Sequence, residues 1–210
     1  MIQVYIIRHG NTFLSDQTPL RVGLGTDIPL VPSGQKQAQD LGTHFRKQGL
    51  APRALFSSVL LRAKQTAQLI QEAGSYTSLT VQVRPELNEI DHGPDEGKPE
   101  HMVEARLGAA AMERWNKEAV MPAEWKPRPQ QIIREWETLL NDVVANIREG
   151  IILMVTSNGR ARFVPGLPGM VLSEEFQAQG DLKLRTGSFG MLEKADESSP
   201  WQLRSWNIRP

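Results

Sequence analysis

The stretch Ile2-Gln-Val-Tyr-Ile-Ile-Arg8-His9-Gly10 joins an apolar run to two basic side chains and a glycine. Residues 2–7 are largely β-branched or aromatic on both faces, which is typical of a central strand that is buried on both sides. Arg8 and His9 follow this run directly, and Gly10 then turns the chain. In open α/β sheets, ligands bind at the carboxyl ends of the strands, so these side chains stand where a ligand is expected.

Strand-like and helical segments alternate along the rest of the chain, which has 210 residues. Strands are expected at 54–58, 79–83, 151–155, 181–186, 188–194 and 201–206, and helices at 33–47, 61–70, 100–118 and 132–147. This alternation predicts an α/β protein, a three-layer α/β/α sandwich with a mostly parallel sheet. One domain is expected over 1–210, with a small helical cap at about 95–130.

The composition excludes several classes of protein. There is no cysteine, which rules out disulfides, thiolate metal sites and a cysteine nucleophile. Lys plus Arg and Asp plus Glu are both 24, so the net charge is zero and no nucleic-acid footprint is expected. The basic residues Arg160, Arg162, Lys183 and Arg185 look scattered. Apolar runs are too short for a signal peptide or a membrane span, so we expect a cytoplasmic protein without membrane contact.

Three ordered motifs resemble the histidine phosphatase (phosphoglycerate-mutase-like) superfamily. Arg8-His9-Gly10-Asn11-Thr12, at the end of the first strand, resembles its RHG signature. The segment Ser57-Ser-Val-Leu-Leu-Arg62-Ala-Lys-Gln-Thr-Ala67 resembles the family's S-x-L-x-R-A-x-x-T-A helix start. Leu87-Asn-Glu89-Ile-Asp-His-Gly93, followed by Glu96-Gly97, resembles its L-x-E-x-x-x-G-x-x-E-G stretch.

The resemblance implies a role for each matching residue. His9 would attack phosphorus and form a phosphohistidine, while Arg8 and Arg62 would hold the phosphoryl oxygens. Glu89 would give a proton to the leaving alcohol and then activate water. No metal or other cofactor is implied. The remaining candidates for binding substrate or phosphate are Asn11, Thr12, Arg21, Thr26, Asn158 and Gly159.

One position departs from the family pattern, which has a second histidine in a V-x-H-G turn after a late strand. The turn here is Val155-Thr-Ser-Asn158-Gly159, so we interpret Asn158 as standing in place of that histidine. Asparagine still donates a hydrogen bond but carries no charge. Losing the charge would cost about 1–2 kcal/mol of transition-state stabilisation, or roughly 5–30-fold in rate. His92, three residues after Glu89, is a candidate to fill the gap.

Three functions remain open. The first is hydrolysis of a small phosphorylated substrate, and the second is phosphoglycerate-mutase-type transfer. A mutase would need basic residues in the cap, where Arg106, Arg114, Lys117, Lys126 and Arg128 are present without matching the mutase stretch. The third is a catalytically weak phosphate-binding or interaction module, suggested by Asn158. The expected partner is a small molecule and no nucleic acid or membrane, with the protein a monomer or a homodimer.

Overall fold

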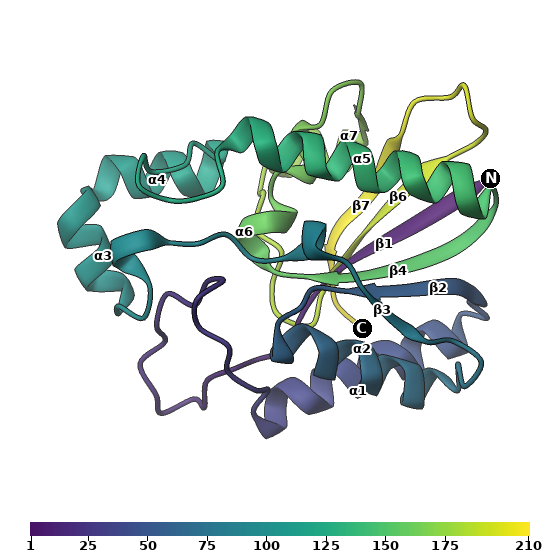
Figure 1. The fold of residues 1–210 in the computed structure, drawn as a ribbon, viewed down its shortest axis with the longest axis horizontal. Helices are drawn as coiled ribbons and strands as arrows, with labels where there is room; N and C mark the ends of the chain where they lie inside the picture. The colour runs from purple at the N-terminus through teal and green to yellow at the C-terminus, as the bar shows by residue number, and fades with distance from the viewer.

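The computed structural model describes residues 1–210 and confirms the α/β fold (Figure 1). A seven-stranded sheet has the order β3-β2-β4-β1-β6-β7-β5. Its strands are β1 (Ile2–Arg8), β2 (Pro52–Ser57), β3 (Val81–Val83), β4 (Gly150–Thr156), β5 (Val171–Leu172), β6 (Phe189–Lys194) and β7 (Gln202–Ile208). Strand β6 pairs antiparallel with both β1 and β7, whereas all other pairs are parallel. The sheet is therefore mostly parallel, with one reversed strand near its middle.

Helices cover both faces of the sheet. On one face lie α1 (Pro32–Lys47) and α2 (Leu61–Gly74), and on the other lies α5 (Pro129–Ile147) (Figure 1). The side chains of β1 alternate between two hydrophobic clusters, because successive residues of a strand point to opposite faces. Val4 and Ile6 belong to the cluster under α5, and Tyr5 and Ile7 to the cluster under α1 and α2. This explains why β1 is apolar on both faces.

Helix α5 buries one stripe of its surface, as the spacing of its apolar residues predicts. Its buried residues are Ile132, Trp136, Leu139, Leu140 and Val143. The indole Nε1 of Trp136 donates a hydrogen bond of 3.1 Å to the carbonyl oxygen of Arg160. Trp136 thus ties α5 to the turn that follows β4.

The segment after β3 differs from the expected single helix over 100–118. It forms two helices, α3 (Glu100–Leu107) and α4 (Ala109–Glu118), at one end of the molecule (Figure 1). The break falls at Gly108, whose φ of +85° lies in a region that L side chains rarely adopt. The remaining short elements are the 3₁₀ turns η1 (Pro85–Leu87), η2 (Gly93–Asp95) and η3 (Val164–Gly166), and helices α6 (Asn158–Ala161) and α7 (Glu174–Gln179).

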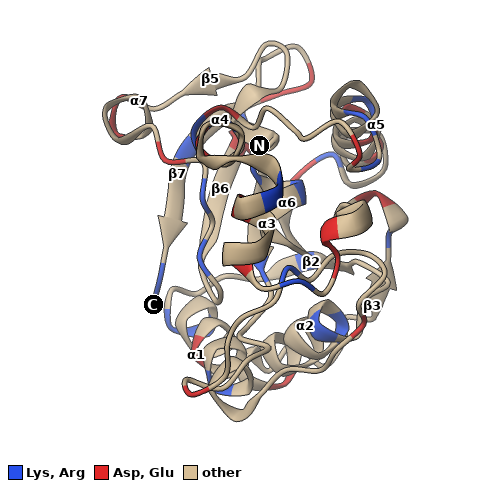
Figure 2. Ribbon diagram, turned by 90° about the vertical axis from the view of Figure 1, so that its left-hand side faces the viewer, with Lys and Arg blue, Asp and Glu red and all other residues tan.

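The C-terminal third contains another difference from the expected strands. Residues 181–186 form no strand, because their backbone groups bond to side chains and turns rather than to a neighbouring strand. Instead the short strand β5 adds an edge beside β7. None of the helices combines the length and the apolar composition needed to cross a bilayer. Seen from the cap end, basic and acidic residues are interspersed along the chain, in keeping with its zero net charge (Figure 2).

Candidate active site

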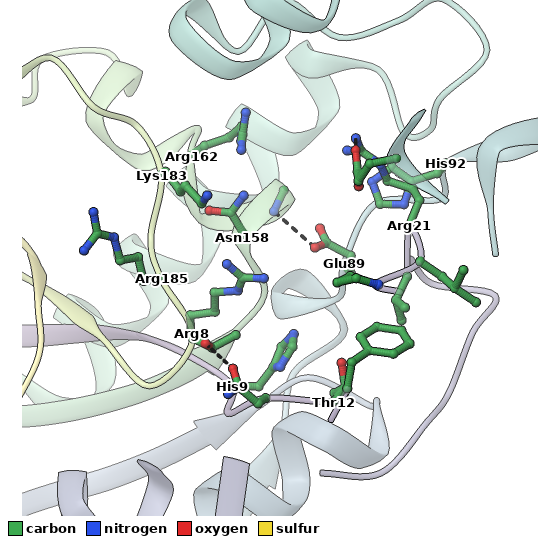
Figure 3. Close-up of a pocket in the computed structure, with 18 of the residues that line it drawn as sticks. Arg8, His9, Thr12, Arg21, Glu89, His92, Asn158, Arg162, Lys183 and Arg185 are labelled. Atoms are coloured by element: carbon green, nitrogen blue, oxygen red, sulfur yellow. Dashed lines mark hydrogen bonds and ion pairs between the residues drawn. The ribbon is translucent and has the colours of Figure 1, made fainter. Parts of the chain in front are cut away.

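The carboxyl ends of β1 and β4 lie side by side and create the site. The parallel register pairs Arg8 with Thr156, and the backbone N–H of His9 donates to the carbonyl oxygen of Thr156 at 3.0 Å. A cavity of about 970 Å³ opens at this edge (Figure 3). Its walls come from the turn after β1, the loop over residues 11–22, Glu89, the start of α6 and residues 181–186.

His9 lies at the bottom of the cavity and is 6% exposed. Its Nδ1 is 2.8 Å from the carbonyl oxygen of Gly10, which can only accept, so Nδ1 carries the proton. Nε2 accepts a hydrogen bond of 3.2 Å from Nε of Arg62. Burial, and then the charges of Arg62 and Arg8, lower the pKa of His9 well below its ordinary value. His9 is therefore a neutral imidazole whose unprotonated nitrogen is Nε2.

Arg62 is fully buried in the first turn of α2 and is held by the loop that precedes α1. Its Nη1 donates to the carbonyl oxygen of Thr26 at 2.8 Å, and its Nη2 to that of Gly23 at 3.0 Å. Glu96 fixes the same loop, since its Oε1 accepts from the N–H of Gly23 at 2.8 Å. Arg62 and Thr26 are not among the residues that line the cavity, but Arg62 contacts His9 at Nε2, the nitrogen without a proton.

Two further arginines line the cavity itself. Arg8 donates from Nη1 to the carbonyl oxygen of Leu184 at 2.8 Å, while its buried Nε has no partner. Burial lowers the pKa of Arg8 to about 10, which leaves it charged at neutral pH. Arg21 pairs with Glu100 of α3, and its guanidinium lies 5.0 Å from the centre of the Trp125 ring. Arg8 is thus directed at the site, whereas Arg21 is anchored to the cap.

Glu89 faces the cavity across from Arg8 and Asn158 (Figure 3). Glu89 is 7% exposed, and its carboxyl group accepts two backbone hydrogen bonds. Its Oε1 accepts from the N–H of Ile90 at 2.9 Å, and its Oε2 from the N–H of Gly159 at 3.1 Å. These two bonds hold the carboxyl group at the cavity wall without an ion pair.

Asn158 begins α6 and also lines the cavity. Its Oδ1 accepts from the N–H of Leu184 at 2.9 Å, so Nδ2 is the donor left for a ligand. Asn11 lines the cavity too, but its amide is already bonded to Ser33 and Thr186. These bonds hold Asn11 against Ser33 and Thr186 and fix the start of the loop over residues 11–22.

Thr12 and His92 complete the cavity wall on the side of the loop. His92 is almost fully buried, and its ring stacks edge-to-face on Trp125 with 4.6 Å between centroids. The structure therefore brings together His9, Arg8, Arg21, Glu89, Asn11, Thr12, Asn158 and Gly159 around one cavity.

Other residues of the site were not expected from the sequence. Arg162, Lys183 and Arg185 line the cavity, although they look like scattered surface charges in the sequence. The spacing of Arg162 carries a signal, since it follows Asn158 by one helical turn. The sequence holds no comparable signal for Lys183 and Arg185. They reach the site because Leu184, between them, is bonded to Asn158 and Arg8, which are distant in the sequence. Ser157, the first residue after β4, is fully buried with an unpartnered hydroxyl.

The arrangement offers a nucleophile, cations and a carboxyl group around one space. A neutral imidazole can attack phosphorus, and guanidinium groups can hold phosphoryl oxygens through paired N–H donors. A nearby carboxyl group can transfer protons to and from oxygen. No three histidine, aspartate or glutamate side chains gather where they could hold a metal ion.

Comparison with known proteins identifies the family of this chain. The family model described as histidine phosphatase superfamily (branch 1) matches residues 4–209. A relative named as a probable phosphoglycerate mutase, GpmB of Yersinia pestis (strain Pestoides F), is 28% identical over 213 residues, covering 99% of this chain and 91% of the relative.

Solved structures show the same fold. A mycobacterial glucosyl-3-phosphoglycerate phosphatase in complex with VO₃ has a TM-score of 0.78 at 24% identity, covering 98% of each chain. A phosphoglycerate mutase from Bacillus anthracis has a TM-score of 0.79 at 20% identity, covering 98% of this chain and 92% of the other. Since the family model spans nearly the whole chain, this protein belongs to the histidine phosphatase superfamily, branch 1.

Proposed function

We propose that the protein is a metal-independent phosphomonoester hydrolase that works through a phosphohistidine at His9. One observation carries the proposal: the hydrogen bond from Nδ1 to the carbonyl oxygen of Gly10 leaves Nε2 of a neutral His9 as the reactive atom. This nitrogen lies in a cavity that also holds Arg8 and Glu89. The family match, and a relative named as a probable phosphoglycerate mutase, support phosphoryl transfer in general.

In the first step, the lone pair on Nε2 of His9 forms a bond to phosphorus and the bond from phosphorus to the ester oxygen breaks. Arg8 and Arg62 stabilise the charge on the three remaining phosphoryl oxygens. Arg62 already donates to Nε2, so its Nε is placed to move onto a phosphoryl oxygen as that lone pair is used. Glu89, in its protonated form, gives a proton to the leaving oxygen.

In the second step, a water molecule takes the place of the released alcohol and attacks phosphorus, and His9 becomes the leaving group. The Glu89 carboxylate takes a proton from water as its oxygen bonds to phosphorus, and the bond between phosphorus and Nε2 breaks. His9 returns to the neutral form with its proton on Nδ1. Glu89 is suited to both steps, because backbone N–H groups hold it on the cavity wall.

Hydrolysis is favoured over mutase chemistry by the placement of the basic residues of the cap. None of Arg106, Arg114, Lys117, Lys126 and Arg128 lines the cavity. Arg106 is paired with Asp95 and Glu124, and Lys117 with Glu113 at 2.7 Å. The basic residues of the cap therefore do not stand on the cavity wall, where a mutase of this kind would need them.

The proposal includes a reduced rate, because Asn158 presents an uncharged donor. The substrate is a small phosphorylated molecule, in keeping with a cavity of about 970 Å³. The competing view, a phosphate-binding module without turnover, is less well supported. His9, Arg8 and Glu89 all line one cavity, and a module that only binds phosphate needs neither the neutral nucleophile nor the proton donor.

The test is steady-state hydrolysis of 4-nitrophenyl phosphate near pH 6 with EDTA present. The natural chain is expected to turn over, His9→Ala to be inactive, and Asn158→His to be faster. Lys47→Met, an exposed residue at the end of α1, serves as the control and keeps the natural rate. Labelled phosphate should pass to water and not to an added alcohol. No turnover in any variant, or turnover lost only with EDTA, would contradict the proposal.

A further inference from the structure

His92 lines the cavity, yet the proposed mechanism gives it no part. The residue is 3% exposed, and its Nδ1 is buried without a hydrogen-bond partner. Leaving a buried polar nitrogen unpartnered costs free energy, so a neighbouring group is expected to compensate for it. The ring cannot move freely, because it packs edge-to-face on Trp125, whose Nε1 donates to Oδ2 of Asp95 at 2.7 Å. His92 is thus held away from Asn158, with Glu89 between the two in Figure 3.

The group that compensates for Nδ1 is the carboxylate of Glu96. Nδ1 of His92 lies 3.7 Å from Oε2 of Glu96, too far for a hydrogen bond but close enough for electrostatic attraction. The same Oε2 accepts from the backbone N–H of His92 at 3.2 Å. Glu96 is charged at neutral pH, because its hydrogen bonds outweigh its burial and bring its pKa to about 2. Since Nδ1 of His92 faces this carboxylate, it is the nitrogen that carries the imidazole proton.

Gly23 lies directly against both of these groups. A Cβ on Gly23 would stand 2.6 Å from Nδ1 of His92 and 2.3 Å from Oε2 of Glu96. The other carboxylate oxygen of Glu96, Oε1, accepts from the N–H of Gly23 at 2.8 Å. Close packing and a hydrogen bond therefore fix the backbone of Gly23 together.

Gly23 connects this contact to the nucleophile. Its carbonyl oxygen accepts from Nη2 of Arg62 at 3.0 Å, and Nε of Arg62 donates to Nε2 of His9 at 3.2 Å. A displacement of Gly23 would move an acceptor of Arg62, and the guanidinium group with it. A continuous chain of packed and hydrogen-bonded groups can couple distant side chains in this way, and mutation tests whether it does.

We infer that His92 is a positioning residue for the reaction at His9. Its Nδ1–H holds the Glu96 carboxylate against Gly23. Gly23 in turn sets the Arg62 guanidinium against Nε2 of His9. The effect of His92 on the rate rests on the proposed function, whereas its effect on the placement of Arg62 does not.

Two substitutions separate the nitrogen of His92 from its ring. His92→Phe keeps an aromatic ring on Trp125 but removes Nδ1, whereas His92→Asn loses the ring but keeps a nitrogen bonded to Cγ. His92→Phe should lower kcat for 4-nitrophenyl phosphate by about 10-fold and change KM by less than about threefold, because Arg62 stabilises charge that develops in the transition state. His92→Asn should keep kcat within about threefold of the natural chain. A natural kcat in His92→Phe, or an equal loss in both variants, would overturn the inference.

NMR measures the placement of Arg62 without any turnover. At neutral pH the ¹⁵N resonance of Nε2 in His9 reports the hydrogen bond from Arg62, since an unprotonated nitrogen that loses its donor resonates further downfield. Comparison with His9→Asn identifies the resonance. His92→Phe should shift it downfield, and His92→Asn should leave it in place. An unshifted resonance in His92→Phe would overturn the inference even if kcat fell, because the loss would then not act through Arg62.

Gly23→Ala disturbs the same contacts from the other side and keeps the test decisive if thermal unfolding shows that His92→Phe does not fold. The new Cβ would displace the Glu96 carboxylate, so kcat should fall by about 10-fold or more and the resonance should again move downfield. Gly25→Ala is the matched control, because its Cβ would lie 3.7 Å from Glu96, an ordinary contact. His44→Phe, which replaces an imidazole outside the cavity, controls for the loss of a histidine. Both controls should keep the natural rate and resonance, and natural values in Gly23→Ala would overturn the inference.

The two readouts separate this inference from the proposed function. A shifted resonance in His92→Phe, with no hydrolysis by the natural chain, would support the placement of Arg62 through His92 and refute the hydrolase. Hydrolysis by the natural chain, with no shift in His92→Phe, would support the hydrolase and overturn the inference.

Discussion

Gly159 and Glu89 approach each other so closely that a side chain at position 159 would displace the Glu89 carboxyl group. The N–H of Gly159 donates to Oε2 of Glu89 at 3.1 Å, and a Cβ on Gly159 would lie 2.4 Å from Oε1 of the same carboxyl group. The backbone of Gly159 is helical, so its φ does not require glycine. The requirement is one of space: α6 approaches the proposed proton donor and fixes it through a backbone bond.

Gly159→Ala should therefore displace Glu89 and lower kcat by about 100-fold, the usual contribution of a positioned general acid. The free energy of unfolding should change by less than about 1 kcal/mol, since alanine favours a helix. Gly166→Ala is the matched control, because its Cβ would meet nothing within 4 Å. Initial rates and thermal unfolding of both variants check this. Full activity in Gly159→Ala would show that the position of Glu89 is not critical.

The protonation state of His9 gives a prediction on pH. Burial and the charges of Arg62 and Arg8 lower its pKa, so His9 should stay neutral as the pH falls through 6.5 and take up a proton only well below it. The unfolded chain protonates this histidine near pH 6.5, so His9 lowers stability progressively as the pH falls below that value. An NMR titration of the imidazole, identified by comparison with His9→Asn, measures this directly. A His9 pKa at or above 6.5 would contradict the account.

Glu96 should hold the loop that positions Arg62. Burial raises the pKa of Glu96, but hydrogen bonds from His92, Thr26 and Gly23 outweigh it and bring the pKa to about 2. Glu96→Gln should therefore cost about 1–3 kcal/mol of stability at neutral pH. The folded pKa is depressed, so this difference from the natural chain should persist above about pH 5 and shrink as the pH falls from about 4.5 toward 2.

Chemical denaturation of both proteins at a series of pH values provides the measurement for Glu96. Equal stability at pH 7 would mean that the charge of Glu96 contributes nothing to the loop. The kcat of Glu96→Gln should also fall, because Gly23 and Thr26 hold the Arg62 guanidinium. A loss of stability with unchanged kcat would remove the loop from the account of catalysis.

Asn158→Asp replaces the Nδ2 donor of Asn158 with an oxygen that can only accept hydrogen bonds. An aspartate oxygen can still accept from the N–H of Leu184, while the other oxygen replaces the Nδ2 donor with a negative charge. We expect kcat/KM to fall by about 100-fold or more at pH 7, since like charges face each other, with little change in unfolding temperature. Steady-state kinetics of both proteins measure the change in kcat/KM. An unchanged kcat/KM would place Asn158 outside the phosphoryl site.

The sequence was sufficient for the part of the structure that depends on local patterns. The apolar run of β1, the stripe of α5 and the alternation of strands and helices predicted the sheet and its layers, and the ordered motifs around His9, Arg62 and Glu89 predicted the family. The break at Gly108 was missed, because an isolated glycine also occurs within continuous helices.

What the sequence could not predict depends on contacts between distant residues. Leu184 is joined to Asn158 and Arg8 across long sequence separations, and only those bonds bring Lys183 and Arg185 to the cavity. Arg62 matched a motif, yet its fixation by the carbonyl oxygens of Gly23 and Thr26 follows from loop geometry. Every residue has a backbone carbonyl group, so the type of residue at positions 23 and 26 does not indicate that its carbonyl oxygen binds Arg62.

Trapping the phosphorylated protein would show directly whether His9 is the nucleophile. Glu89→Gln, which cannot activate water, is mixed with 4-nitrophenyl phosphate, whose leaving group needs no proton, and quenched under mildly alkaline denaturing conditions. Intact mass spectrometry should show the added mass of one phosphoryl group, stable in base and lost in acid, and peptide mapping should locate it on His9. The adduct should be absent from the Glu89→Gln, His9→Ala double variant. Nitrophenol release without any adduct on His9, or an adduct on another residue, would contradict the account.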